Sequence, residues 1–207
     1  MGDAGLPMRR HRGETGAAKR SGFACGYAPA MEASTVRVAR VTPELADAVR
    51  TLRVAPAQAA YVGDPAFNLA NALQDRLSEA MAVLRGDDVI GFYRLDFSPR
   101  AITGRPHPAP SVGVRAFLVD HRHQGHGIGA VAARAMCDDL AYRHPRQRLA
   151  LLAVHCRNRA AVATYRRAGF IDTGQWLGGG RAGPQHVMLR RLAPVAAPAR
   201  MGQSPDG

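Results

Sequence analysis

A strand, a glycine-rich turn and a helix follow one another in residues 112–142, and this succession restricts the fold more than any other feature of the chain. The apolar run 112–119 predicts a strand, glycines alternate within 124–129, and apolar residues then recur at helical spacing. Glycines let the backbone approach a ligand closely, and the first turn of a helix presents unpaired N–H groups and a positive dipole end. The succession therefore predicts a site for an anion such as a pyrophosphate.

Spacing distinguishes this turn from other phosphate-binding loops. A P-loop ends in Gly-Lys-Ser/Thr, but the only lysine of the chain is Lys19. In a dinucleotide fingerprint the glycines follow the strand directly and an acidic residue ends the next strand. Here several residues separate Val119 from Gly127, and the next predicted strand ends at Val154 and His155. A turn with no ligand is disfavoured, because each glycine destabilises a helix by about 1 kcal/mol relative to alanine.

A second pattern lies downstream, where a predicted strand at 149–154 is followed by a helix at 158–168. Asn158 is a suitable N-cap residue and Gly169 a suitable end. Residues 158–170 read N-x-x-A-x-x-x-Y-x-x-x-G-F, and residues 124–129 read Q-G-H-G-I-G. Both patterns, in this order and each after a strand, resemble the GNAT acetyltransferases, whose turn reads Q/R-x-x-G-x-G/A.

The resemblance implies a single α/β domain, with a mixed central sheet whose central strands splay apart and are flanked by helices. It also implies acetyl-CoA as co-substrate, with its pyrophosphate on the backbone amides of the glycine turn and its pantetheine arm along the preceding strand. The implied cofactor-binding residues are Phe117, Leu118, Val119, Gln124, Gly125, His126, Gly127, Ile128, Gly129, Asn158, Ala161 and Tyr165.

Tyr165 is the implied catalytic residue. Acetyl transfer to an amine expels a thiolate, and a hydroxyl beside the sulfur can protonate it. Without the resemblance, Tyr165 would be interpreted as a core aromatic on the same helical stripe as Ala161. Asn158 is likewise interpretable as a helix cap, a role that is compatible with a cofactor contact.

The general base is not evident. Many relatives carry a glutamate on the strand before the glycine turn, whereas residues 112–117 contain no carboxylate. Water, Asp96, Asp120 and His155 are the candidates. A histidine cluster at residues 121, 123 and 126 overlies the phosphate motif, and no nearby Cys or Glu completes a tetrahedral ligand set, so we expect no metal.

The N-terminal half bears on the acceptor. Residues 52–62, with Leu69, resemble the GNAT branch that includes spermine/spermidine acetyltransferases, which suggests a small amine acceptor, with a polyamine as one candidate. Gln58 and Tyr61 are candidates for the acceptor mouth, or else form a helix-end turn with a packed aromatic. A polycation needs acidic partners, and the candidates are Asp64, Asp75 and Asp87.

The remaining pattern predicts the domain organisation. We expect a disordered extension at 1–34, an acetyltransferase domain at 35–193 and a disordered tail at 194–207, with Met31 as an alternative start. The expected order of elements is β-α-α-β-β-β-α-β-α-β-β. Its strands are at 35–41, 80–84, 89–97, 112–119, 149–154, 170–176 and 186–189, and its early helices run from 42 to Pro56 and over 67–77.

The composition of the chain disfavours several other classes of function. The net charge of +12 comes from arginines spread along the chain, whereas a nucleic-acid footprint is a clustered patch, so we expect no specific nucleic acid. No apolar run reaches the roughly 18 residues of a membrane helix, and no signal peptide is evident, so we expect a cytoplasmic protein without a membrane partner. Three scattered cysteines predict free thiols. A homodimer is expected from the family, and the alternative function is a catalytically silent acyl-CoA-binding regulator.

Overall fold

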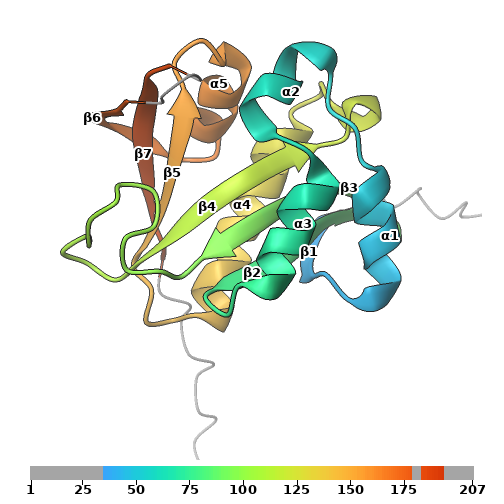
Figure 1. The fold of residues 1–207 in the computed structure, drawn as a ribbon, viewed down its shortest axis with the longest axis horizontal. Helices are drawn as coiled ribbons and strands as arrows, with labels where there is room; N and C mark the ends of the chain where they lie inside the picture. Colours follow the sequence, from blue (N-terminus) through green and yellow to red (C-terminus); the bar gives the residue numbers. More distant parts are fainter. Residues whose placement is uncertain (1–34, 179–182, 194–207) are drawn as a thin grey trace, which may run out of the picture. The chain divides into compact units, whose positions relative to one another are not determined.

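A computed structural model describes residues 35–178 and 183–193. Within these residues, seven strands form one mixed sheet in the order β1-β2-β3-β4-β5-β7-β6 (Figure 1). Neighbouring strands are antiparallel except β4 and β5, which are parallel. This confirms the predicted α/β fold with a mixed sheet flanked by helices. The extensions predicted at 1–34 and 194–207 lie outside the described residues.

The elements alternate along the chain much as the sequence predicts. The strands are β1 (Val36–Arg40), β2 (Ser78–Arg85), β3 (Asp88–Asp96), β4 (Ser111–Val119), β5 (Leu149–His155), β6 (Ile171–Leu177) and β7 (Gln185–Arg191). The helices are α1 (Pro43–Thr51), α2 (Pro56–Val62), α3 (Pro65–Gln74), α4 (Ile128–Arg143) and α5 (Arg159–Arg167), with a 3-10 turn η1 (His121–His123) before α4.

The sequence predicts two helices before β2, but the structure has three, and this prediction was wrong. Pro56 was expected to end the first helix, whereas it occupies the first turn of α2. Proline is favoured there because its missing N–H would have no intrahelical partner and its φ is already helical. The next helix also begins earlier than predicted, since Pro65 follows Asp64, whose side chain accepts a hydrogen bond from the Phe67 N–H.

The helices cover the two faces of the sheet and create two cores (Figure 1). On one face, α1 and α3 bury residues such as Val49 and Leu69 against β2, β3 and β4. On the other face, α4 and α5 bury residues such as Met136 and Tyr165 against the middle of the sheet. The α4 stretch is rich in small residues, which lets that helix lie close to the strands. Both faces of the central strands are therefore buried.

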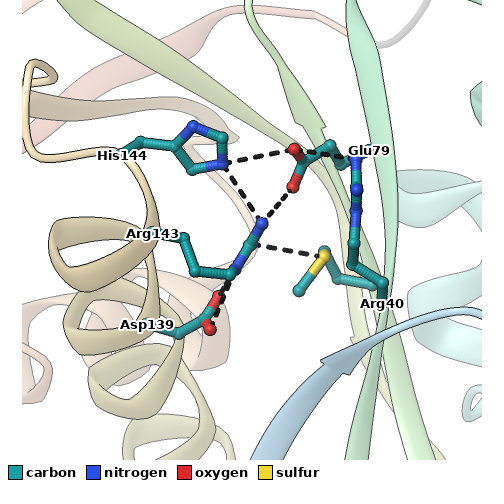
Figure 2. A network of polar contacts seen from close by, with 6 residues as sticks. Arg40, Glu79, Asp139, Arg143 and His144 are labelled. Carbon is teal, nitrogen blue, oxygen red and sulfur yellow. Dashed lines mark hydrogen bonds and ion pairs between the residues drawn. The ribbon is translucent and has the colours of Figure 1, made fainter.

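An ion-pair network around the buried carboxylate of Glu79 connects the end of α4 to the sheet (Figure 2). Glu79 of β2 receives hydrogen bonds or ion pairs from Arg143 at 2.6 Å, Arg40 at 3.0 Å and His144 at 3.2 Å. Arg143 also binds Asp139 one turn earlier on α4, at 2.8 Å. Burial alone would raise the pKa of Glu79, but the hydrogen bond and charge of Arg143 outweigh it, and the pKa is lowered.

Two further predictions concern the cysteines and membrane-spanning helices. Cys137 is buried and Cys156 half-buried, both as free thiols, while Cys25 lies outside the described residues. Among the helices that the structure describes, none is both long and apolar enough to span a membrane.

Candidate active site

The site lies where β4 and β5 separate. Their parallel pairing runs from Ser111 opposite Leu149 to Val114 opposite Leu152 and then stops. Beyond that point β4 continues to Val119 paired only with β3, and β5 continues to His155 paired only with β7. Alternate backbone groups on the open side of β4 therefore lack a strand partner in the described chain, as at any sheet edge. This is the splay that the resemblance implies.

A bulge in β4 accompanies the splay. Register between β3 and β4 shifts at this point, so that Ala116 and Phe117 together oppose Tyr93. Ala116 has φ of 50°, which is uncommon for a residue with a Cβ. An extra residue of this kind bends its strand and re-aims its side chains, and such bulges are over-represented beside active sites. The bulge places the ring of Phe117 edge-on to that of Tyr165, with 5.8 Å between centroids.

The larger cavity at this splay has a volume of about 470 Å³. It lies between the end of β4, the glycine turn, α5 and the region around α2. Nearly all the predicted cofactor-binding residues line it: Phe117, Leu118, Val119, Gln124, Gly125, His126, Gly127, Gly129, Asn158, Ala161 and Tyr165. Ile128 is the exception, because its side chain packs against the core beneath α4 and its N–H donates to the Gly125 carbonyl at 3.2 Å.

The glycine turn offers unpaired donors to this cavity. Gly125, His126 and Gly127 have φ of 86°, 45° and 76°, so three successive residues adopt the left-handed region before α4 begins. Within the described chain, the N–H groups of Gly125, His126, Gly127 and Gly129 donate to no protein acceptor. Successive N–H groups in such a turn, reinforced by the positive end of a helix, form an anion-binding concavity.

Gly129 has a separate packing role. A Cβ added there would lie 3.1 Å from Thr164 Cγ2, tighter than ordinary contact. Only a residue without a side chain lets the first turn of α4 approach α5 this closely. The width of the larger cavity at this point is therefore set by the Gly129–Thr164 contact.

Two side chains hold the turn against the rest of the domain. Gln124 donates from Nε2 to the Val119 carbonyl and to Gln58 Oε1, both at 2.8 Å. Asp120 is fully buried and accepts hydrogen bonds from the Arg53 N–H at 2.9 Å and from Arg122, whose Nε lies at 2.8 Å. Burial alone would raise the pKa of Asp120, but the hydrogen bonds from Arg122 and Arg53 dominate and lower it.

Helix α5 supplies the opposite wall. Asn158 caps it by accepting the Ala161 N–H at 3.1 Å, as predicted, and this leaves the Asn158 amide N–H groups available to a ligand. Tyr165 is 8% exposed, and its ring also meets Phe170 edge-on at 5.6 Å. Burial raises the pKa of Tyr165 well above its ordinary value of 10.0. The hydroxyl is therefore a neutral donor across the usual assay range.

A second cavity, of about 200 Å³, adjoins the first across Phe117, Asn158, Ala161 and Tyr165, which line both. Tyr61, Arg115, His155 and Gln185 are among its other lining residues. Tyr61 packs on His155 with 5.0 Å between ring centroids. Gln58, which the sequence placed with Tyr61 at an acceptor mouth, lines the larger cavity instead. Tyr165 thus lies between the larger cavity and the smaller one.

The three side chains considered as a general base differ in position. Asp96 binds Arg115 at 2.7 Å and the Ser98 N–H at 3.0 Å. Asp120 binds Arg122 and the Arg53 N–H. Neither lines a cavity. His155 lines the smaller one, but its Nδ1 accepts the Arg157 N–H at 3.0 Å. In the neutral ring the proton is then on Nε2, which can donate but not accept.

Several lining residues were not predicted. On α5 these are Ala160, Ala163 and Thr164, and near α2 they are Val54 and Val62. In the smaller cavity, Arg115 could have been found as the one charged residue within the apolar run of β4. Ile102 and Gln185 lie far from either motif, and no local pattern indicates them. The described chain holds no group of three or more His, Cys, Asp or Glu residues placed to bind a metal ion.

Comparison with protein-family models identifies the class. The model of the acetyltransferase (GNAT) family matches residues 46–170, more than half of the chain and inclusive of both motifs. The chain belongs to this family. The predicted family, and with it the predicted class of enzyme, an acetyltransferase, are therefore confirmed. A comparison with curated protein sequences finds no match.

Solved structures share the fold. The aminoglycoside acetyltransferase AAC(6')-Ib in complex with paromomycin and acetyl-CoA aligns with a TM-score of 0.61 at 16% identity, covering 76% of this chain and 93% of that one. Spermidine N-acetyltransferase from Vibrio cholerae in complex with CoA and spermine aligns with a TM-score of 0.59 at 16% identity, covering 77% and 96%. An uncharacterized protein from Bacillus halodurans gives 0.63 at 13% identity, covering 75% and 83%.

Proposed function

We propose that this acetyltransferase moves the acetyl group of acetyl-CoA to the primary amine of a small molecule, by direct attack in a ternary complex. The observation that carries the proposal is the set of four unpaired N–H groups at Gly125, His126, Gly127 and Gly129, residues that line the same cavity of about 470 Å³ as Tyr165. A diphosphate has the charge and the acceptor oxygens that such a row binds. Two of the three solved structures described above carry acetyl-CoA or CoA.

The remaining lining residues fit the rest of the coenzyme. The open edge of β4 at Phe117 and Leu118 offers backbone groups to the amides of a pantetheine arm, in the manner of an added strand. Asn158 offers free amide N–H groups, and Arg167 brings a positive charge to the cavity wall. In this arrangement the acetyl end would lie near the junction of the two cavities, at Tyr165.

Acetyl-CoA, when bound, supplies an acyl carbon open to attack and a sulfur leaving group. The amine forms the new C–N bond as the C–S bond breaks, and Tyr165 donates its hydroxyl proton to the departing sulfur. The proton released from the amine nitrogen returns, directly or through water, to the tyrosine oxygen. Tyr165 suits this role because burial raises its pKa, so that its hydroxyl keeps its proton until the sulfur departs.

No side chain of the described residues presents a free basic lone pair in the smaller cavity, as argued for Asp96, Asp120 and His155. We therefore propose that the acceptor enters as the neutral amine, having lost its proton to water. The rate should then rise with pH as the acceptor deprotonates, with an apparent pKa that follows the acceptor used.

Two measurements test the proposal. Calorimetry should show binding of acetyl-CoA, and S-acetylpantetheine, which lacks the diphosphate, should bind about a hundredfold more weakly, since two hydrogen bonds to a charged group contribute roughly 3 kcal/mol or more. If the purified protein does not bind acetyl-CoA at millimolar concentration, the proposal is rejected. A thiol-release assay over a panel of amines then tests transfer, and binding without turnover of any amine would favour the alternative function, a silent acyl-CoA-binding regulator.

We extend the proposal to partners and location on the grounds of sequence alone. The acceptor is a small molecule, with no specific nucleic acid and no membrane partner, because the arginines are spread along the chain and no long apolar run is present. We propose that the protein is cytoplasmic and forms a homodimer. Analytical ultracentrifugation of the full chain tests the dimer.

A further inference from the structure

The smaller cavity has an unusual balance of charge for an enzyme that acetylates amines. Its charged side chain is Arg115, with His155 and Gln185 as further polar groups, and no carboxylate of the described residues lines it. A polyamine or an aminoglycoside carries several positive charges, which require acidic partners. The cavity therefore lacks the groups that would hold a polycation and contains one that would repel it.

The acidic residues considered for a polyamine are engaged elsewhere. Asp64 caps α3, and Asp75 binds Arg94 at 2.6 Å. Asp87 lies in the β2–β3 turn, 3.9 Å from Arg37. None of the three lines either cavity.

The carboxylate of Asp96 holds Arg115 in place. Its Nε donates to Asp96 Oδ2 at 2.7 Å, and Asp96, whose side chain is 7% exposed, also accepts the Ser98 N–H on Oδ1 at 3.0 Å. Burial would raise the pKa of Asp96, but the hydrogen bonds from Ser98 and Arg115 outweigh it and lower the pKa, so the pair stays charged. A guanidinium has five N–H donors, and within the described chain only the one on Nε is used. The terminal N–H groups remain available, and the side chain is 45% exposed.

The wall beside Arg115 is built by a close approach of the loop after β3. A Cβ at Gly113 would lie 2.8 Å from Ala101 Cβ and 3.1 Å from Ile102 Cγ1, so glycine is required for the loop to pack on β4. Ile102 itself has φ of 66°, which is a rare strained conformation for a β-branched residue. Backbone strain of this kind clusters at ligand sites. Ile102 lines the same cavity as Arg115 and adds an apolar surface to it.

We propose that the acceptor is a small amine that carries a carboxylate, with the carboxylate bound by Arg115 and the amine directed toward Tyr165. The guanidinium fork matches a carboxylate in shape, and such pairs are bidentate. Gln185 can donate a further hydrogen bond from its side-chain amide. A volume of about 200 Å³ suits a molecule of amino-acid size, or the end of a larger one. This inference rests on the proposed function and specifies its substrate.

The test compares each carboxylate with its amide. Alanine and alaninamide, and β-alanine and β-alaninamide, are assayed by thiol release with acetyl-CoA, beside spermidine and kanamycin. Each amine is compared at the same fraction of neutral form, because the members of a pair differ in amine pKa. We expect kcat/KM for at least one carboxylate to be at least tenfold higher than that for its amide. We also expect it to be higher than that for spermidine or kanamycin.

Variants assign the preference to Arg115. Arg115→Gln should raise KM for the carboxylate at least tenfold and leave the amide within twofold, so that the preference disappears. Arg37→Gln removes the same charge from the exposed edge strand β1 and should leave both unchanged. Arg115→Lys keeps the charge without the fork and should restore part of the preference. Thermal unfolding tests whether each variant is folded. If Arg115→Gln does not fold, the Arg115→Lys variant decides: a weaker carboxylate preference than that of the natural enzyme supports the assignment, and an unchanged preference contradicts it.

The outcomes separate the inference from the proposed function. If acetyl-CoA binds and a polycation is the best acceptor, or if the carboxylates and amides react equally, the inference is overturned while the function stands. The same holds if acetyl-CoA binds, another amine of the panel is acetylated and no carboxylate is; if acetyl-CoA binds and no amine is acetylated, the alternative function, a silent regulator, is favoured. If acetyl-CoA does not bind, the proposed function itself fails.

Discussion

Replacement of Tyr165 by phenylalanine isolates one hydroxyl group at the junction of the two cavities. Among the described residues this hydroxyl has no hydrogen-bond partner, so its removal leaves no protein group unpaired. The ring retains its edge-on contacts with Phe117 and Phe170. We therefore expect the free energy of unfolding to change by less than about 1 kcal/mol. Binding of acetyl-CoA should stay within about threefold, or roughly 0.7 kcal/mol.

Turnover should fall much further, because the hydroxyl would act only as the sulfur departs. General acid catalysis contributes about 10²–10⁴-fold, so we expect kcat to fall at least tenfold, equivalent to about 1.4 kcal/mol or more of lost transition-state stabilisation. The assay is steady-state thiol release with a saturating amine. An unchanged kcat in Tyr165→Phe would reject the acid role.

Tyr93 provides a matched control. It is also a buried tyrosine, its ring packs against Phe117 at 5.9 Å, and its hydroxyl is unpaired in the described chain, but it lines neither cavity. Tyr93→Phe should leave kcat within twofold and should not lower the free energy of unfolding, since it removes a buried hydroxyl that lacks a partner. Equal losses of kcat in both variants would indicate that the activity depends on packing in this aromatic cluster.

The pH dependence adds a further check on the same residue. Burial raises the pKa of Tyr165 above its ordinary value of 10.0, so the acid form persists up to at least that pH. The rate should rise with pH as the acceptor deprotonates and then reach a plateau. Tyr165→Phe should lower the plateau without moving the rising limb. A falling limb centred below about pH 9 in the natural enzyme, absent in the variant, would contradict this reasoning.

Three other variants test how the site is supported. Asp120→Ala leaves two backbone N–H groups without their acceptor, and urea unfolding should show a loss of about 2–4 kcal/mol; a loss below about 0.5 kcal/mol would contradict the assignment. Gly129→Val should weaken acetyl-CoA binding about tenfold by calorimetry, through overpacking against Thr164, and adding Thr164→Ala should recover part of it. Glu79→Gln should reduce stability by about 1–3 kcal/mol at neutral pH, because Arg143 loses one of its two carboxylate partners and keeps Asp139. Since the pKa of Glu79 is lowered, its contribution is present above its ordinary value of 4.5 and lost as pH falls below it, so the natural chain and Glu79→Gln should converge in acid.

The sequence predicted those parts of the site that neighbouring residues determine. The cap at Asn158 and the left-handed turn before α4 each depend on a few contiguous positions, so a local pattern indicates them. The pair of Arg115 with Asp96 joins residues 19 positions apart, and that of Gln124 with Gln58 joins residues 66 apart. These contacts depend on strand register and helix placement, which no local pattern specifies. The lining of the smaller cavity, apart from Tyr61, His155 and the residues that it shares with the larger one, was therefore missed.

One extra residue in β4 explains why the two cavities meet at an aromatic ring. In a regular strand Val112, Val114 and Ala116 would share one face, and Phe117 would share the other with Arg115. The structure instead packs Val114 and Phe117 on the α4 and α5 side and Ala116 on the α1 and α3 side. The bulge at Ala116 and Phe117 reverses the alternation there. It thereby brings Phe117 to Tyr165, and the change of direction coincides with the end of pairing with β5. The packing of the proposed acid follows from this single irregularity, and the opening beside it begins just before the same point of the strand.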